Sequence, residues 1–185
     1  MRAAIPYKVV GGLRFYERKE VKDLLAYLRV LANPDDEVSL RRIINLPKRG
    51  IGDRALEEVE AFANAQGISF WRALLRVTEA TGVPNKAAQS IVTFTQMLIA
   101  LQTLVEAKTK PSVIIEAVLE QSGLMTELEN SKDPQDEVRV ENLQELVSAS
   151  MEYEERPFDE LGEDEEISLS GFLEKVSLVA DADDI

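Results

Sequence analysis

Two glycines separated by one residue stand in a strongly basic stretch, RRIINLPKRGIGDRALEEV. Glycine accepts a positive φ and has no Cβ to hold a phosphate away, so we expect the amides of Gly50, Ile51 and Gly52 to point outward together. A helix capped by Asp53 would add the positive end of its dipole. The spacing is typical of a helix-hairpin-helix loop and predicts a backbone site for phosphate, with Ile51 inserted into the core.

Basic side chains surround this loop. They are Arg41, Arg42, Lys48, Arg49 and Arg54, and residues 41–54 contain one acid against these five bases. Such a set neutralises phosphates without reading base edges, so the predicted binding is independent of nucleotide sequence and weakened by salt. The alternative is that Gly-Ile-Gly is an ordinary tight turn between helices and that the bases are solvated surface charges.

A second basic segment, GGLRFYERKEVKDLLAYLRVLANPDD, offers Arg18 and Lys22 as weaker candidates for nucleic-acid contact. Charge pairs at i, i+4 spacing with neighbouring acids would account for the same residues as an ordinary helix surface. The β-prone run Tyr7–Val10 precedes Gly11 and Gly12. Because a lone strand cannot belong to a helical bundle, the glycine pair is a candidate hinge to another unit.

Composition excludes several kinds of chemistry. The 185 residues include no Cys and no His, which removes thiol nucleophiles, zinc sites and imidazole bases. There is no G-x-x-x-x-G-K-[ST] motif for an autonomous NTPase, and no acidic cluster with the spacing of a metal site. The sequence therefore predicts neither catalytic nor metal-binding residues. A nuclease or lyase that uses carboxylates and a lysine is an enzymatic alternative with weak support.

The net charge of −13 hides a segregated pattern. Residues 1–56 carry 12 Lys/Arg and 7 Asp/Glu, a net +5, which leaves −18 on residues 57–185. The segment EERPFDELGEDEE holds eight acids and one Arg, and we expect a mobile, solvated loop over residues 152–167. No apolar run approaches the roughly 18 residues of a membrane span, and the first residues lack the apolar stretch of a secretion signal, so we expect a cytoplasmic protein without a membrane partner.

Hydrophobic periodicity predicts an all-α fold, an irregular helical bundle with the short N-terminal strand outside it. Helices are expected at about residues 16–32, 38–44, 53–66, 69–78, 86–107, 112–121, 137–151 and 168–179. Residues 91–105 are apolar most of the way round, which predicts the central helix of the bundle and, at about 15 residues, one too short to span a membrane. Trp71 beside Phe70 is expected in the core.

The match to a known family is wider than one loop. The segment IPYKVVGGLRFYERKEVKDLLAYLRVLANPDDEVSLRRIINLPKRGIGD resembles the stretch that enters subdomain 2B of the UvrD/PcrA/Rep superfamily 1 DNA helicases. RVENLQELV, Arg139 to Val147, resembles a second signature of that subdomain, and GFLEKVSLVADADDI resembles its exit. The likeness covers essentially the whole chain, and its details look actinobacterial.

In that family, subdomain 2B is an insertion in subdomain 2A. The resemblance therefore implies that residues 1–12 end subdomain 2A, that residues 13–178 form helical subdomain 2B and that residues 179–185 return to 2A. It also implies that Tyr7–Val10 completes the 2A sheet. Gly11–Gly12 and Ala180–Ile185 would be two hinge strands close together, about which 2B swivels to regulate unwinding.

The same resemblance implies the partners. The family's GIG loop contacts duplex or fork DNA through its backbone, which carries over to Gly50, Ile51 and Gly52 with Lys48, Arg49 and Arg54 as supporting charges. Its motif IVa, at the edge of the single-strand track, matches the segment with Arg18 and Lys22. ATP and Mg²⁺ belong to the parent enzyme, a 3′–5′ helicase of DNA repair, and this fragment would hold no cofactor.

Further implied partners are subdomains 1A, 1B and 2A of the same helicase, and repair proteins or a second copy of the chain. An alternative from another class remains open at this point. The chain could be a helical adapter that binds protein and never touches DNA, with the −18 on its larger part keeping it off the backbone.

Overall fold

The computed structural model describes residues 14–155 and 166–183, with side chains up to residue 180. The expected strand at Tyr7–Val10, the hinge Gly11–Gly12 and most of the acidic loop lie outside the described residues. All regular structure within the described ranges is helical, which confirms the predicted all-α class.

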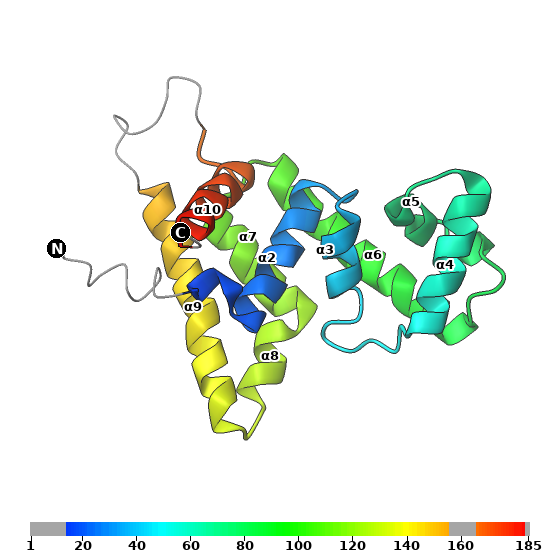
Figure 1. The fold of residues 1–185 in the computed structure, drawn as a ribbon, viewed down its shortest axis with the longest axis horizontal. Helices are drawn as coiled ribbons and strands as arrows, with labels where there is room; N and C mark the ends of the chain where they lie inside the picture. Colours follow the sequence, from blue (N-terminus) through cyan, green and yellow to red (C-terminus); the bar gives the residue numbers. More distant parts are fainter. Residues whose placement is uncertain (1–13, 156–165, 184–185) are drawn as a thin grey trace.

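Two short 3₁₀ turns accompany the helices. The elements are η1 Phe15–Glu17, α2 Lys19–Ala32, α3 Glu37–Ile43, α4 Asp53–Gln66, α5 Phe70–Leu75, η2 Val77–Glu79, α6 Asn85–Glu106, α7 Pro111–Ser122, α8 Leu124–Glu129, α9 Pro134–Glu154 and α10 Leu169–Asp183. Figure 1 shows an elongated arrangement, with α4 and α5 at one end, α8, α9 and α10 at the other, and α2, α3 and α6 between them.

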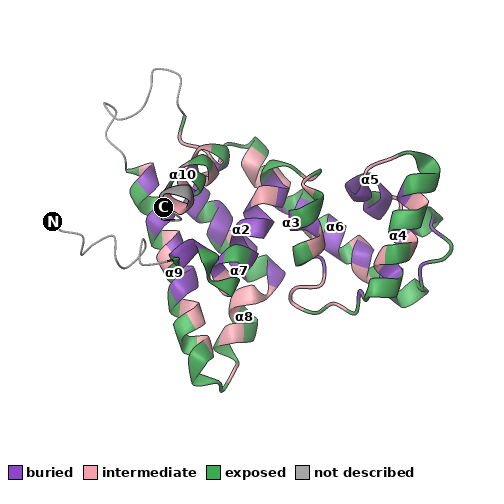
Figure 2. Ribbon diagram, viewed as in Figure 1, coloured by how far each residue is buried: buried purple, intermediate pink, exposed green. Residues whose placement is uncertain are grey.

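The centre of the bundle is α2. Nine of its fourteen residues are buried, and it packs against α3, α6, α7, α9 and α10 (Figure 2). The prediction that residues 91–105 form the central helix is therefore wrong. That stretch lies in α6, which connects the two ends of the molecule and buries one stripe that includes Phe94 and Leu98, while Ile99 is 45% exposed.

The helix predicted over residues 86–107 is confirmed, with bounds one residue earlier. α6 has 22 residues, and by length and composition alone it could cross a membrane. Its buried side, which includes Phe94 and Leu101, instead contributes to the core that α6 shares with α2, α5 and α7.

Short polar contacts fix the helix ends. Asp36 and Asp133 accept hydrogen bonds from the first-turn amides of α3 and α9, at 3.1 and 2.9 Å. The Glu154 carboxylate at the end of α9 accepts from the amide and the hydroxyl of Ser112, at 2.6 and 2.9 Å. The N-terminus of α7 is thus satisfied by a residue 42 positions away, which ties the two helices together.

Two predicted boundaries are corrected. α9 continues through Glu154, so the expected loop at residues 152–167 begins later, and α10 continues to Asp183, so residues 180–183 are helical and not a hinge strand. Arg14 and Ala180 line the same cavity, and α10 packs on α2. The described chain therefore starts and ends its path on one side of the molecule (Figure 1).

Candidate nucleic-acid interface

The Gly-Ile-Gly loop connects two helices that belong to different parts of the bundle. α3 packs chiefly on α2, and α4 packs on α5. The Arg41 guanidinium of α3 bridges to Glu60 of α4 at 3.5 Å and stacks over Phe70 of α5, 4.2 Å from the ring centroid. The connection therefore departs from the expected compact helix-hairpin-helix, because the two helices do not pack chiefly against each other.

The three central residues have different environments. Gly50 has a φ of +77° and is exposed, and a Cβ added there would meet nothing within 4 Å. Ile51 is 1% exposed and fills the core, as predicted. Gly52 has φ −87° and ψ 179°, an extended conformation open to any residue, with the same empty space in front of it. Positive φ therefore explains a glycine at position 50 and not at position 52.

The three amides do not point outward together, contrary to the prediction. The Ile51 amide donates to Oδ1 of Asn45 at 3.2 Å and so faces inward. The amides of Gly50 and Gly52 have no hydrogen-bond partner among residues 14–155 and 166–183. Gly52 is the N-cap of α4 without any side-chain cap, and Asp53 is the first helical residue rather than the cap. Two exposed residues whose amides have no described partner therefore lie at the positive end of a 14-residue helix.

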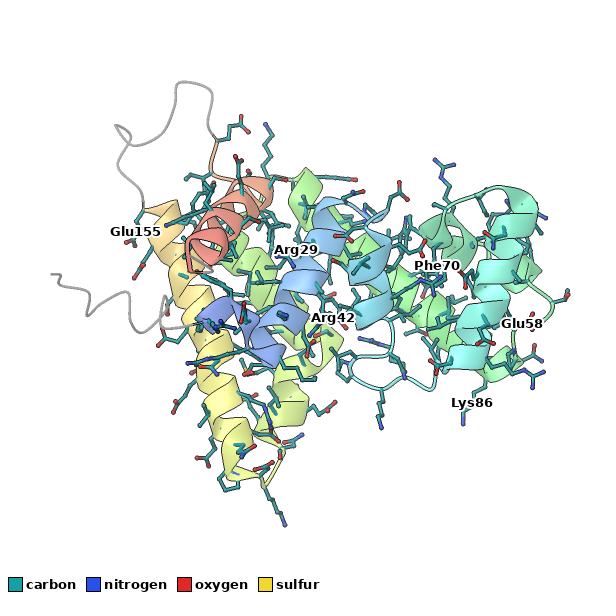
Figure 3. All side chains as sticks on the ribbon, viewed as in Figure 1. Arg29, Arg42, Glu58, Phe70, Lys86 and Glu155 are labelled. Atoms are coloured by element: carbon teal, nitrogen blue, oxygen red, sulfur yellow. The ribbon has the colours of Figure 1, made fainter. Side chains whose placement is uncertain are left out.

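The surrounding cations divide into two groups. Lys48 and Arg54 are exposed, and no described carboxylate lies within ion-pair distance of either. Arg41 is held by Glu37 at 2.9 Å as well as by Glu60. Arg42, which Figure 3 labels near the centre of the view, pairs with the buried Asp23 of α2 at 2.9 Å. Lys48 and Arg54 are therefore the side chains of this set that can reach an external anion without first breaking an ion pair.

Arg49 faces the interior, in contrast with its expected role as a supporting charge for DNA. One guanidinium nitrogen donates to the carbonyls of Ile43 at 2.9 Å, Ile44 at 3.1 Å and Leu46 at 3.1 Å. The other donates to the Tyr27 hydroxyl at 2.5 Å, and the group lies 5.0 Å from the Phe94 ring centroid. The C-terminal carbonyls of α3 attract this cation because they have no partners within the helix.

The Tyr27 hydroxyl completes this interior contact. It donates to the Leu46 carbonyl at 2.5 Å while it accepts from Arg49. Burial raises the pKa of Tyr27 above its usual 10.0, and the nearby Arg49 guanidinium offsets part of that rise. The phenol is therefore neutral at physiological pH and can serve as donor and acceptor at once.

The two candidates of the second basic segment, Arg18 and Lys22, also have different environments. Arg18 donates to the side-chain oxygen of Asn142 at 2.6 Å and lies over Phe15, so it joins the start of α2 to α9. Lys22 is exposed and lines a cavity together with Arg14 and Arg29. Of the two candidates, Lys22 retains a free ammonium group in the described structure.

Sequence reasoning missed Asn45 and Tyr27. A signal for the first was present, since an Asn just after a helix and two residues before Pro47 is placed to accept hydrogen bonds from turn amides. Nothing in the sequence distinguishes Tyr27 from the other apolar positions of its helix. Among the described residues, no group of three or more Asp or Glu is arranged to hold a metal ion.

Residues 1–185 match the family described as UvrD-like helicase C-terminal domain. The chain is 48% identical over 195 residues to ATP-dependent DNA helicase UvrD1 of Mycobacterium tuberculosis, and 42% over 187 residues and 36% over 185 residues to ATP-dependent DNA helicase PcrA of Staphylococcus epidermidis and Bacillus subtilis. These alignments cover all of this chain and 24–25% of each relative, so it spans about a quarter of their length.

Proposed function

The chain belongs to the UvrD-like helicase family, and we propose that it is the duplex-DNA-contacting, regulatory subdomain 2B of an ATP-dependent 3′–5′ DNA helicase of repair. The relatives are ATP-dependent DNA helicases four times as long, so ATP and Mg²⁺ would bind elsewhere in the longer protein. The contribution of this chain is to hold the duplex through its sugar-phosphate backbone.

One observation carries the proposal. The amides of Gly50 and Gly52 have no partner in the described part of the chain, and they lie beside the exposed side chains of Lys48 and Arg54, which no described carboxylate pairs. Main-chain amides at a helix N-terminus bind phosphate oxygens well, and the absence of a Cβ at both glycines lets the phosphate approach closely. The site offers both donors and positive charge to an anion.

The charge pattern sets the character of this binding. Each neutralised phosphate adds about 0.9 to the slope of log affinity against log salt, so Lys48 and Arg54 would contribute about 1.8. Backbone amides read no base edge, and the binding would be independent of nucleotide sequence. The acidic remainder of the chain would repel DNA from its other faces and so orient the duplex on this loop.

The first and last parts of the described chain lie on one side of the molecule, which supports the proposal of a movable unit. Arg14 and Ala180 line one cavity, so a longer chain would enter and leave through one edge. An insertion attached at one edge can swivel as a body, with Gly11 and Gly12 as the proposed hinge. In that arrangement subdomains 1A, 1B and 2A are its immediate partners, and its outer faces are available to repair proteins or a second copy.

The test is fork-DNA binding by the chain, measured by fluorescence anisotropy over a series of salt concentrations. Lys48→Gln and Arg54→Gln should each weaken binding and lower the salt slope by about 0.9. Lys110→Gln, which removes one exposed charge at the start of α7, is the matched control and should change neither quantity. Equal behaviour of all three variants would overturn the proposal. Retained capture of a repair protein without any fork binding would favour the helical adapter.

A further inference from the structure

The loop between α3 and α4 is held from its inner side by two side chains, Asn45 and Arg49. Oδ1 of Asn45 accepts hydrogen bonds from the amides of Arg49 at 2.7 Å and Ile51 at 3.2 Å. The Arg49 guanidinium binds three carbonyls and the Tyr27 hydroxyl. Both side chains are half-buried; Arg49 directs its guanidinium toward Tyr27 and Phe94, and Asn45 directs its side-chain oxygen to the amides of the loop itself.

The Asn45 contact determines which amides remain free. It takes up the Ile51 amide, and the Ile51 side chain is buried beside it. With the amides of Arg49 and Ile51 both bound to Asn45, those of Gly50 and Gly52 have no partner among the described residues and stay available to an external acceptor. Without Asn45, the Ile51 amide would lose its partner, and the loop could exchange one set of outward amides for another.

The Arg49 contact requires a planar fork. Its donors reach carbonyls of Ile43, Ile44 and Leu46 and, from the second nitrogen, the Tyr27 hydroxyl. Lysine has the same charge, but its single ammonium nitrogen cannot reach acceptors that are bound by two separate guanidinium nitrogens. The contact therefore depends on guanidinium shape as well as on charge, which separates it from a simple phosphate contact.

We infer that Asn45 and Arg49 are positioning residues of the phosphate-binding loop, which fix the outward direction of the Gly50 and Gly52 amides while Arg49 itself touches no phosphate. The inference rests on the proposed function of this loop. Of the three basic residues beside the glycines, the inference assigns Arg49 to the interior of the protein and leaves Lys48 and Arg54 to contact phosphate.

The first experiment is the salt series of fork binding on Arg49 variants. Arg49→Lys and Arg49→Gln should both reduce affinity by about tenfold, roughly the effect of losing one hydrogen bond to a charged group, while the salt slope stays that of the unmodified chain. Lys48→Gln is the matched comparison and should lower the slope by about 0.9. Wild-type affinity in Arg49→Lys, or a lower slope in Arg49→Gln, would overturn the inference, because either result marks a direct charge contact.

The second experiment uses no DNA. Amide hydrogen exchange followed by NMR should show the Ile51 amide protected in the unmodified chain and exchanging faster in Asn45→Ala, with core amides of α2 unchanged. Asn45→Asp keeps both acceptor interactions and should restore the protection. Unchanged Ile51 exchange in Asn45→Ala would overturn the inference whatever the DNA results.

The two experiments also separate this inference from the proposed function. If Asn45→Ala loosens the loop but no variant at Lys48, Arg49 or Arg54 alters fork binding, then the proposed function fails and the loop anchor remains. If Lys48 and Arg54 matter while the Arg49 and Asn45 variants bind normally, then the positioning role fails alone. If circular dichroism shows that Arg49→Lys is unfolded, the comparison of Asn45→Ala with Asn45→Asp tests the positioning role instead.

Discussion

Arg42 of α3 lies 2.9 Å from Asp23 of α2, and this carboxylate is 7% exposed while its partner is 39% exposed. Lys19 approaches the same carboxylate from one turn earlier, at 3.0 Å. A cation that sequence alone offers to DNA is therefore held in a structural ion pair, which attaches the helix before the Gly-Ile-Gly loop to the centre of the bundle.

We expect Asp23→Ala to lower the free energy of unfolding by about 1–3 kcal/mol, because it removes a buried acceptor from two cations that retain access to water. Urea unfolding measures the change. Glu57→Ala, at an exposed position of α4, is the control and should stay within about 0.5 kcal/mol of the unmodified chain. A loss no larger in Asp23→Ala than in the control would contradict a structural role for this pair.

The two glycines should respond differently to alanine. Gly50→Ala places a side chain at φ +77° and should cost about 1–2 kcal/mol of stability. Gly52→Ala has an ordinary φ and open space, so it should cost no more than about 1 kcal/mol, the preference for glycine over alanine at an N-cap. Both add a methyl group in front of the outward amides, and both should weaken fork binding. A Gly52→Ala chain that is stable and binds fork DNA normally would show that no phosphate approaches this residue closely.

Ile51 anchors the loop by apolar burial. At 1% exposure, its replacement by Ala should lower the free energy of unfolding by about 2–5 kcal/mol, whereas Ile51→Val should cost about 0.5–1.5 kcal/mol. Thermal or urea unfolding distinguishes the two values. Comparable small losses in both variants would mean that the loop relaxes around the missing atoms and is not fixed by this side chain.

The raised pKa of Tyr27 predicts a loss of stability at high pH. Its folded-state pKa lies above 10.0, which is close to the unfolded value, so the folded state retains the proton more strongly. The stabilisation is fully present below pH 10 and is lost as pH rises through the raised pKa. Free energies of unfolding between pH 8 and 11 should fall more steeply in the unmodified chain than in Tyr27→Phe. Parallel curves would contradict the assignment.

The positions of the long helices were predictable because apolar residues recur at helical spacing in each of them. α4 ends at Gln66, before Gly67 at φ +64°, as the glycine signal indicated, whereas Asp53, expected as its cap, is its first residue. α8 was missed because six residues after Gly123 are too few to show a period. The central helix was misassigned because α6 carries apolar residues such as Ile99 on its solvent side, and burial depends on neighbours that a period does not specify.

The candidate site was predictable in part. The glycine spacing and the local excess of bases located the loop, but Lys48 and Arg49 look equivalent in the sequence. Which of them faces outward depends on acceptors supplied by α2 and by the end of α3, through Tyr27 and the carbonyl of Ile43. Those partners are distant in sequence or belong to the main chain, so the residue types around Arg49 do not reveal them.

The neighbouring positions of Arg14 and Ala180 have a practical consequence. Chain segments that leave a folded unit side by side can be joined directly, which is why such units tolerate excision and transplantation. A longer polypeptide containing this one should accept a short glycine-serine bridge in place of residues 15–179. The unit could equally be grafted between two adjacent surface positions of an unrelated host.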